Sequence, residues 1–166
     1  RPTGGGIVKH GEDWTYSLVF PPSHPVCEGS ASEVYLYVHR AISVSFAKCS
    51  VDTVLLPCKE GGCSFTPRKV IPGQCFLEPV ARDVILSATN SKIAGAAIKR
   101  TRAGLLLQGT IDMRALPDVN WNFFETFFLA ELSAYLGAEP ELAEWPQFFE
   151  SSRKPYVEQF TSTGWL

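Results

Sequence analysis

Hydrophobic positions follow two different spacings along this chain, and each spacing predicts one type of element. Runs that alternate between hydrophobic and polar residues, rich in β-branched and aromatic side chains, predict strands. These runs cover residues 7–20 (with a turn at 11–13), 51–56, 80–86, 92–100 and 104–113. Residues 87–91 are typical of a hairpin turn, and residues 57–73 are typical of a loop because they are rich in glycine, proline, lysine and cysteine.

Hydrophobic residues at helical spacing predict three helices. Ser32 is a candidate N-cap for a helix over residues 33–48, and a second helix runs from Trp121 to a stop at Gly137. The third helix covers residues 153–161. Large side chains on one face of the second helix are expected in the core: Phe124, Phe127, Phe128, Leu132 and Tyr135. The predicted class is α+β, with a mixed, mostly antiparallel sheet flanked by helices.

Length and composition favour a single globular domain. The chain has 166 residues, of which 45% are hydrophobic and 19% are charged, so it can bury a core without metal or disulfides. A net charge of −2 argues against a nucleic-acid partner or an anionic membrane surface. No apolar stretch approaches the roughly 18–20 residues that cross a bilayer. We therefore expect neither a nucleic-acid partner nor a membrane association.

Cysteine usage favours a reducing compartment. The chain has five cysteines at irregular spacings: Cys27, Cys49, Cys58, Cys63 and Cys75. A secreted disulfide framework would more naturally have an even number in a shorter chain, so we expect free thiols and a cytoplasmic location. No second pair of Cys or His stands near Cys58 and Cys63 at ligand spacing, so no metal site is predicted.

Two short runs carry the candidate chemistry. The first, RPTGGGIVKHGEDWTYS, begins the chain, and its three consecutive glycines allow another molecule to approach the backbone N–H groups closely. The second, KIAGAAIKRTRAGLLLQGT at residues 92–110, places a lysine beside a stretch of small residues. A slot without bulky side chains next to an ammonium group suits an apolar chain that carries a reactive carbonyl.

These runs resemble the lipoate–protein ligase and octanoyltransferase family. The resemblance rests on RPTGGG-x-V-x-H…YS, on Cys75-Phe76, and on the following KIAGAA and LLQGT segments. It covers nearly the whole chain and implies the biotin/lipoate ligase-like catalytic fold. Family members normally carry several dozen residues before the glycine run. We therefore expect residues 1–166 to form one such catalytic domain that lacks the usual N-terminal part.

The resemblance implies roles for particular residues. Lys92 is the expected catalytic lysine, whose ammonium stabilises negative charge at the acyl carbonyl. Cys75 is the expected nucleophile, which accepts the acyl group as a thioester. The substrate-binding residues implied by the family are Arg1, Gly4, Gly5, Gly6, His10, Tyr16, Ser17, Asp83, Gly95 and Ala96. A buried structural role for Cys75 and a surface role for Asp83 are the alternatives.

The implied reaction moves an octanoyl or lipoyl group to a lysine of a lipoyl domain or of a glycine-cleavage H-type carrier protein. The donor is acyl carrier protein, and no cofactor is required, if the protein is a transferase. An ATP-dependent lipoate–protein ligase is the main alternative; it would use free lipoate, ATP and Mg²⁺, pass through lipoyl-AMP, and leave Cys75 dispensable. A biotin ligase fits less well, because Gly6 is followed by Ile7 and Val8 rather than by basic residues. A non-catalytic protein that binds lipoate or lipoyl domains is the alternative from another class.

Overall fold

A five-stranded sheet organises the part of the chain that the structure describes. The computed structural model describes residues 11–58 and 79–162. The strands are β1 (Asp13–Phe20), β2 (Thr53–Leu55), β3 (Val84–Leu86), β4 (Lys92–Thr101) and β5 (Gly104–Asp112). They lie in the order β1-β5-β4-β3-β2, and every neighbouring pair is antiparallel. The predicted α+β class with a mostly antiparallel sheet is confirmed.

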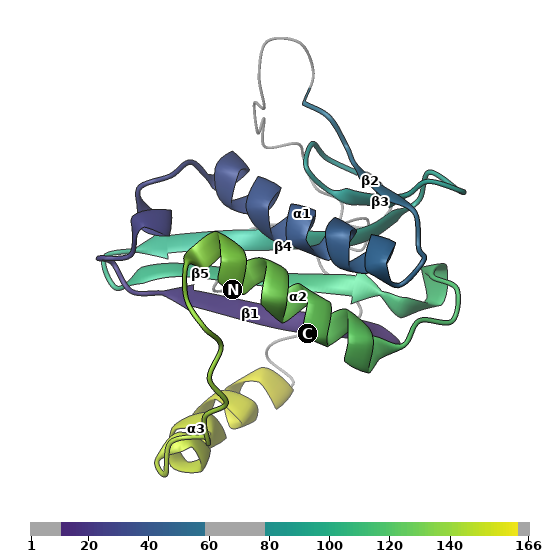
Figure 1. Ribbon diagram of the computed structural model, residues 1–166. Coiled ribbons are helices and arrows are strands. Elements are labelled where there is room, and N and C mark those ends of the chain that lie inside the picture. Colours follow the sequence, from purple (N-terminus) through teal and green to yellow (C-terminus); the bar gives the residue numbers. More distant parts are fainter. Residues whose placement is uncertain (1–10, 59–78, 163–166) are drawn as a thin grey trace.

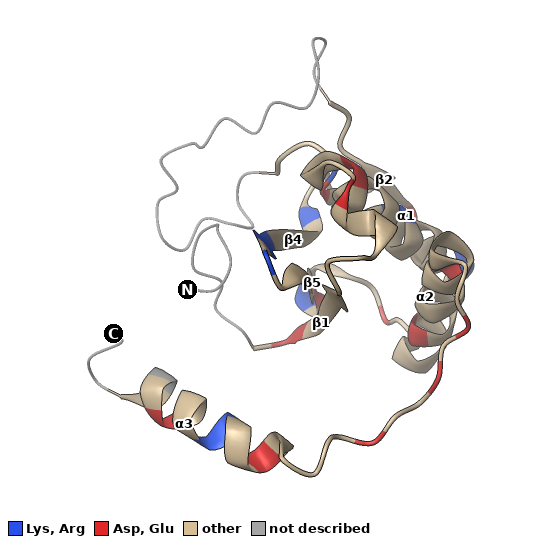
Figure 2. Ribbon diagram, turned by 90° about the vertical axis from the view of Figure 1, so that its left-hand side faces the viewer, with Lys and Arg blue, Asp and Glu red and all other residues tan. Residues whose placement is uncertain are grey.

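Helices cover one face of this sheet. The α-helices are α1 (Ala31–Lys48), α2 (Trp121–Leu136) and α3 (Phe149–Thr161), and two short 3-10 helices are η1 (Pro25–Cys27) and η2 (Met113–Ala115). Helices α1 and α2 lie side by side across the sheet, whereas α3 stands apart from them (Figure 1). The edge view in Figure 2 places both α1 and α2 on the same side of β1, β4 and β5. We call the opposite side of the sheet the distal face.

Two predicted strands are shorter than expected, and part of a third cannot be compared. Strand β2 covers three residues of the predicted 51–56, and β3 begins at Val84 instead of residue 80. Residues 80–83 instead form a turn in which the Asp83 amide donates to the Val80 carbonyl oxygen (3.0 Å). Strand β1 begins at Asp13, and residues 7–10 of the predicted first strand lie outside the described residues.

The N-cap of α1 is Ser30 and not the predicted Ser32. The Glu33 amide donates to Ser30 Oγ (3.2 Å), and the Ser30 amide donates to Glu33 Oε2 (2.7 Å). This reciprocal capping box satisfies two amides that otherwise have no partner at a helix start. The spacing Ser30-x-x-Glu33 selects the earlier serine, so the helix begins two residues before the predicted range.

The third helix also begins earlier than predicted. Helix α3 starts at Phe149 instead of residue 153, which leaves Pro155 inside it. A helix that began at residue 153 would have this proline in its first turn, where the missing N–H costs nothing. The second helix agrees with prediction: Asn120 caps its start, and Gly137, with φ of 62°, ends it in the left-handed conformation.

The core lies between the sheet and the helix pair. The predicted core face of α2 is confirmed for Phe124, Phe128 and Leu132, which are buried. It is wrong for Tyr135, which is exposed, and Phe127 is only half-buried. The Trp14 ring of β1 meets the rings of Phe124 and Phe128 edge-on, with centroids 5.4 and 5.7 Å apart. Such edge-to-face pairs add to the energy of burying the rings.

The thiols agree with prediction only in part. Cys27 and Cys49 are free, but Cys58 is disulfide-bonded, so the prediction of free thiols is wrong for Cys58. A disulfide requires only that the chain bring two cysteines within bonding distance, which an irregular sequence spacing does not exclude. Within residues 11–58 and 79–162, no helix is long and apolar enough to cross a bilayer.

A glycine on β5 makes room for an aromatic ring. Gly109 faces Tyr16 across the β1–β5 pair, and a Cβ on Gly109 would lie 2.2 Å from Tyr16 Cζ. We expect Gly109→Ala to lower the free energy of unfolding by about 1–3 kcal/mol, because the ring must shift out of a packed core. Urea unfolding measures this loss. Gly11→Ala is the matched control, since its Cβ would meet no atom within 4 Å; equal stability of both variants would contradict the packing argument.

Candidate functional site

An irregularity in the sheet decides where Lys92 points. In the β3–β4 pair, Val84 lies opposite Ala94 but Ile85 lies opposite Lys92, so β4 has one extra residue at Ile93. Both Ile93 and Ala94 are fully buried in the core. Because successive residues of a strand normally alternate between faces, a bulge that turns two neighbours inward sends the residue before them to the other face. Lys92 therefore points to the distal face.

Lys92 and Asp83 form a nearly buried ion pair. Lys92 Nζ lies 2.9 Å from Asp83 Oδ2, and the two side chains are only 10% and 5% exposed. The Val80 amide donates to the same carboxylate oxygen (2.7 Å). A charged pair withdrawn from water must be held in good geometry and by further hydrogen bonds to be tolerated. The predicted lysine and the predicted aspartate are thus brought together, and the surface alternative for Asp83 is wrong.

Gly95 provides the space in which the lysine side chain lies. A Cβ on Gly95 would stand 2.6 Å from Lys92 Cε, 2.8 Å from Lys92 Nζ and 3.3 Å from Asp83 Oδ1. A side chain at this position would therefore displace the ammonium from the carboxylate. This contact gives a physical reason for a glycine three residues after the lysine in KIAG.

The remaining predicted residues on β1 and β4 divide between the two faces of the sheet. Ser17 is exposed and shares the distal face with Gly95, whereas Tyr16 and Ala96 pack against the core beneath the helices. Burial raises the pKa of Tyr16 above its usual range, so its phenol stays protonated. Small or polar residues line the distal face in register with Ser17 and Gly95: Thr15, Ala97, Gln108 and Thr110.

Several predicted residues cannot be placed. Arg1, Gly4, Gly5, Gly6, His10 and Cys75 lie outside the described residues. Their roles as acyl-slot, substrate and nucleophile residues remain predictions. Among the residues that are described, no group of three or more His, Cys, Asp or Glu side chains is arranged to hold a metal ion.

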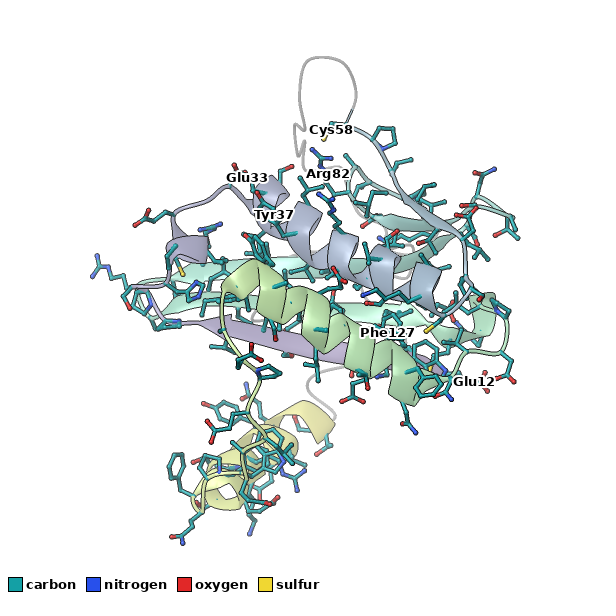
Figure 3. The ribbon with its side chains drawn as sticks, viewed as in Figure 1. Glu12, Glu33, Tyr37, Cys58, Arg82 and Phe127 are labelled. Carbon is teal, nitrogen blue, oxygen red and sulfur yellow. The ribbon has the colours of Figure 1, made fainter. Side chains whose placement is uncertain are left out.

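One residue that contacts the site is not among the candidates predicted from the sequence. His39, from the middle of α1, is buried, and its Nδ1 lies 2.6 Å from the carbonyl oxygen of Arg82, the residue before Asp83. Arg82 lies at the upper edge of the molecule in Figure 3, as does Cys58. A histidine among hydrophobic positions of a helix has no sequence signal of its own, because its partner is 43 residues away.

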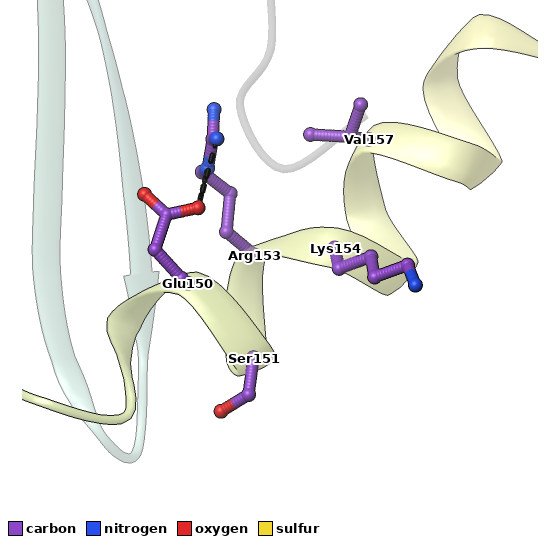
Figure 4. A pocket seen from close by; sticks show the side chains of 5 residues that line it. All are labelled: Glu150, Ser151, Arg153, Lys154 and Val157. Atoms are coloured by element: carbon purple, nitrogen blue, oxygen red, sulfur yellow. Dashed lines mark hydrogen bonds and ion pairs between the residues drawn. The ribbon is translucent and has the colours of Figure 1, made fainter.

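Two hollows at the surface lie elsewhere. One is lined by five residues of α3 alone (Figure 4), where Arg153 donates to Glu150 Oε2 (2.9 Å). The other lies between η1, α1 and the end of α2, where Tyr37 stacks on Tyr135 with centroids 4.0 Å apart. Neither hollow is lined by Lys92 or Asp83. We take the distal face around the ion pair as the candidate site, because it brings together Lys92, Asp83 and Gly95 of the predicted site.

Comparison with known families matches most of the chain. A sequence model of the biotin/lipoate A/B protein ligase family matches residues 1–114. The octanoyltransferase LipM of Kyrpidia tusciae is 31% identical over 120 residues, which are 71% of this chain and 42% of that protein. LipM of Halalkalibacterium halodurans is 29% identical over 127 residues, or 75% and 44%. The chain therefore spans less than half the length of these relatives.

Solved structures share the fold. A lipoate-protein ligase A bound with ATP superposes with a TM-score of 0.67 at 15% identity, covering 99% of this chain and 69% of that one. A bi-partite lipoate protein ligase from Thermoplasma acidophilum, described with its E2 lipoyl domain, gives a TM-score of 0.66 at 15% identity, covering 99% and 68%. At this identity the likeness establishes the biotin/lipoate ligase-like fold.

The contact between Gly95 and Lys92 leads to a prediction. We expect Gly95→Ala to push the flexible end of Lys92 away from Asp83 while the backbone stays in place. Labelling with an amine-reactive reagent, read by peptide mass spectrometry, should then modify Lys92 several-fold faster than in the wild type. Gly29→Ala is the matched control, because the nearest atom to its Cβ is 3.5 Å away. Unchanged labelling in Gly95→Ala would show that the space is not needed.

Burial also gives His39 a pH-dependent effect on stability. Desolvation lowers the pKa of its imidazole, opposed by the Arg82 carbonyl and the Asp83 carboxylate and reinforced by Lys92. Below about pH 6.5 the unfolded chain therefore binds more protons than the folded chain. The stability that the neutral ring provides is complete above that pH and is lost as the pH falls through the folded-state pKa.

A variant without a titrating ring tests this effect. His39→Asn keeps an N–H donor near Nδ1, and we expect it to lose less stability than the wild type between about pH 7 and pH 5. Urea unfolding at both pH values measures the two losses. His10 and His24 are present in both proteins, so the difference isolates His39. Equal losses would contradict the assigned direction of the pKa change.

Proposed function

The chain belongs to the biotin/lipoate A/B protein ligase family, and on that basis we propose that it serves in protein lipoylation as an acyltransferase. The group transferred is an octanoyl or lipoyl group, and the acceptor is a lysine of a lipoyl domain or of a glycine-cleavage H-type carrier protein. The octanoyltransferase relatives support transfer of an octanoyl group. The proposed donor is acyl carrier protein, and the proposed reaction needs no cofactor. The observation that carries the proposal is the Lys92–Asp83 pair on a sheet face lined by small or polar residues.

Lys92 would act on the acyl carbonyl. Its ammonium lies 2.9 Å from the Asp83 carboxylate and is held over Gly95, so its position is set before substrate binds. Negative charge develops on the carbonyl oxygen when a nucleophile adds to a thioester. A preorganised cation in a site that excludes water stabilises that charge strongly. Asp83 orients the lysine and does not itself need to contact substrate.

Cys75 would carry the acyl group between donor and acceptor. Its thiolate attacks the thioester carbonyl of the donor, the carrier thiolate leaves, and an enzyme thioester results. The neutral amine of the acceptor lysine then attacks this thioester and forms an amide. The Cys75 thiolate leaves, and the proton lost by the amine nitrogen passes to solvent. The support for this step is the Cys75-Phe76 segment seventeen residues before Lys92 and the likeness to octanoyltransferases.

An ATP-dependent ligase is the second candidate. The fold shared with an ATP-bound lipoate-protein ligase A favours it. In that reaction Lys92 would face the carboxylate of lipoate and the phosphate of lipoyl-AMP, Mg²⁺ would accompany ATP, and Cys75 would not be required. The two candidates therefore differ in the need for ATP and in the need for the thiol.

Intact-mass spectrometry distinguishes these reactions. The protein is mixed with octanoyl acyl carrier protein in the absence of ATP, and we expect an octanoyl adduct on the wild type and none on Cys75→Ser. Cys49→Ser is the matched control, because Cys49 is a free thiol that the mechanism does not use. Lys92→Met should slow adduct formation about 100-fold or more, as expected for the loss of an oxyanion-stabilising group.

The other outcomes each support a different function. Lipoylation of a carrier domain that requires ATP and free lipoate, and is unaffected by Cys75→Ser, would establish a ligase. Binding of a lipoyl domain with neither adduct nor lipoylation would establish a non-catalytic binding protein. An adduct that persists in Cys75→Ser would exclude Cys75 as the nucleophile.

A further inference from the structure

His39 connects the helix layer to the turn that presents Asp83. The imidazole is only 1% exposed, and Nδ1 lies 2.6 Å from the Arg82 carbonyl oxygen. A carbonyl oxygen can only accept a hydrogen bond, so Nδ1 must carry the proton and donate. Within the described residues, the other ring nitrogen has no hydrogen-bond partner. The contact with Arg82 is therefore the polar interaction that this ring makes with the described protein.

The turn that receives this hydrogen bond has an unusual backbone. Arg82 adopts φ of 77°, a conformation that costs energy for a residue with a side chain and persists only where the surroundings hold it. Two backbone hydrogen bonds with Leu56, the residue after β2, stabilise this turn. The Arg82 amide donates to the Leu56 carbonyl oxygen (2.8 Å), and the Leu56 amide donates to the Asp83 carbonyl oxygen (2.9 Å). His39 on α1 makes a further contact, with the Arg82 carbonyl oxygen.

We propose that His39 is a positioning residue for the Lys92–Asp83 pair. The hydrogen bond from His39 fixes the position of the Arg82 carbonyl and therefore the backbone position of the next residue, Asp83. The Asp83 carboxylate must reach both the Val80 amide and Lys92 Nζ. His39 is linked to Arg82 by a hydrogen bond, and Arg82 is linked to Asp83 by the backbone. Asp83 in turn forms the ion pair with Lys92. Its importance for acyl transfer rests on the proposed function.

A purely structural role for His39 does not account for these features. Burying an imidazole costs free energy that a leucine would not cost, unless the ring makes a hydrogen bond that the site needs. The bond it makes ends on the residue next to Asp83 and not on a remote part of the core. Burial also lowers the pKa of the ring, which keeps it neutral and keeps its single donor directed at the carbonyl near neutral pH.

Two substitutions separate the donor from the volume of the ring. His39→Leu fills much of the same space without a donor, whereas His39→Asn places an amide N–H near the position of Nδ1. Hydrogen exchange is measured at the Val80 and Leu56 amides, which donate to Asp83. The reference is the Val51 amide, which donates to the Phe46 carbonyl oxygen (2.9 Å) beyond the C-terminal end of α1.

We expect exchange at Val80 and Leu56 to rise about 10-fold or more in His39→Leu, to remain near the wild-type rate in His39→Asn, and to stay unchanged at Val51 in both. In the acyl-transfer assay, His39→Leu should lower kcat by about 10- to 100-fold with little change in KM, because a displaced catalytic group affects the reaction more than binding. His39→Asn should recover most of this loss.

These measurements distinguish a failure of the acyltransferase proposal from a failure of the positioning role of His39. If the wild type transfers no acyl group but the exchange pattern is as expected, the proposed function is wrong and the positioning of Asp83 by His39 stands. If exchange at Val80 and Leu56 does not rise in His39→Leu, or rises equally at Val51, the positioning role is wrong. A loss of kcat in His39→Asn as large as in His39→Leu would also overturn it.

Discussion

The one-residue bulge at Ile93 is the constraint on which the site depends. Without it, the alternation of strand side chains would place Lys92 on the same face as Ala94, in the apolar layer beneath α1. The bulge turns both Ile93 and Ala94 into the core and Lys92 to the distal face. Burial of two hydrophobic side chains thus stabilises the irregular register, and the same irregularity aims the lysine. Core packing and site geometry are determined by one backbone feature.

The Lys92–Asp83 ion pair contributes more to fixing the position of the lysine than to the stability of the fold. Two charges that are 10% and 5% exposed lose most of their hydration, and their attraction offsets that loss only in part. The surrounding contacts reduce the cost: the Val80 amide donates to the carboxylate, and Gly95 leaves room for the lysine chain. What the arrangement provides is a cation whose position is set in advance, which is the property that stabilisation of a developing oxyanion requires.

Much of the fold could be predicted from hydrophobic spacing, but the site could be predicted only in part. Helix α2, with its aromatic face and its stop at Gly137, follows directly from helical periodicity. The alternation of side chains along a strand also predicts that Tyr16 and Ser17 lie on different faces of the sheet. The register shift at Ile93 and the contact of His39 with Arg82 join segments far apart in sequence, so no local pattern reports them. The family resemblance placed Lys92 and Asp83 separately among the candidate site residues, and the fold shows that they form an ion pair.

The distal face of the sheet and the helix layer differ in how freely their residues can be substituted. Residues on the distal face are separated from the helix layer by the sheet, and a shared fold can carry different chemistry there. Helix α1 has no such freedom, because the buried face that packs on the sheet also carries His39 to the turn before Asp83. A change in how α1 packs would move that turn, and with it the carboxylate that holds Lys92. The helix layer is in this sense part of the site, although it lies on the other side of the sheet.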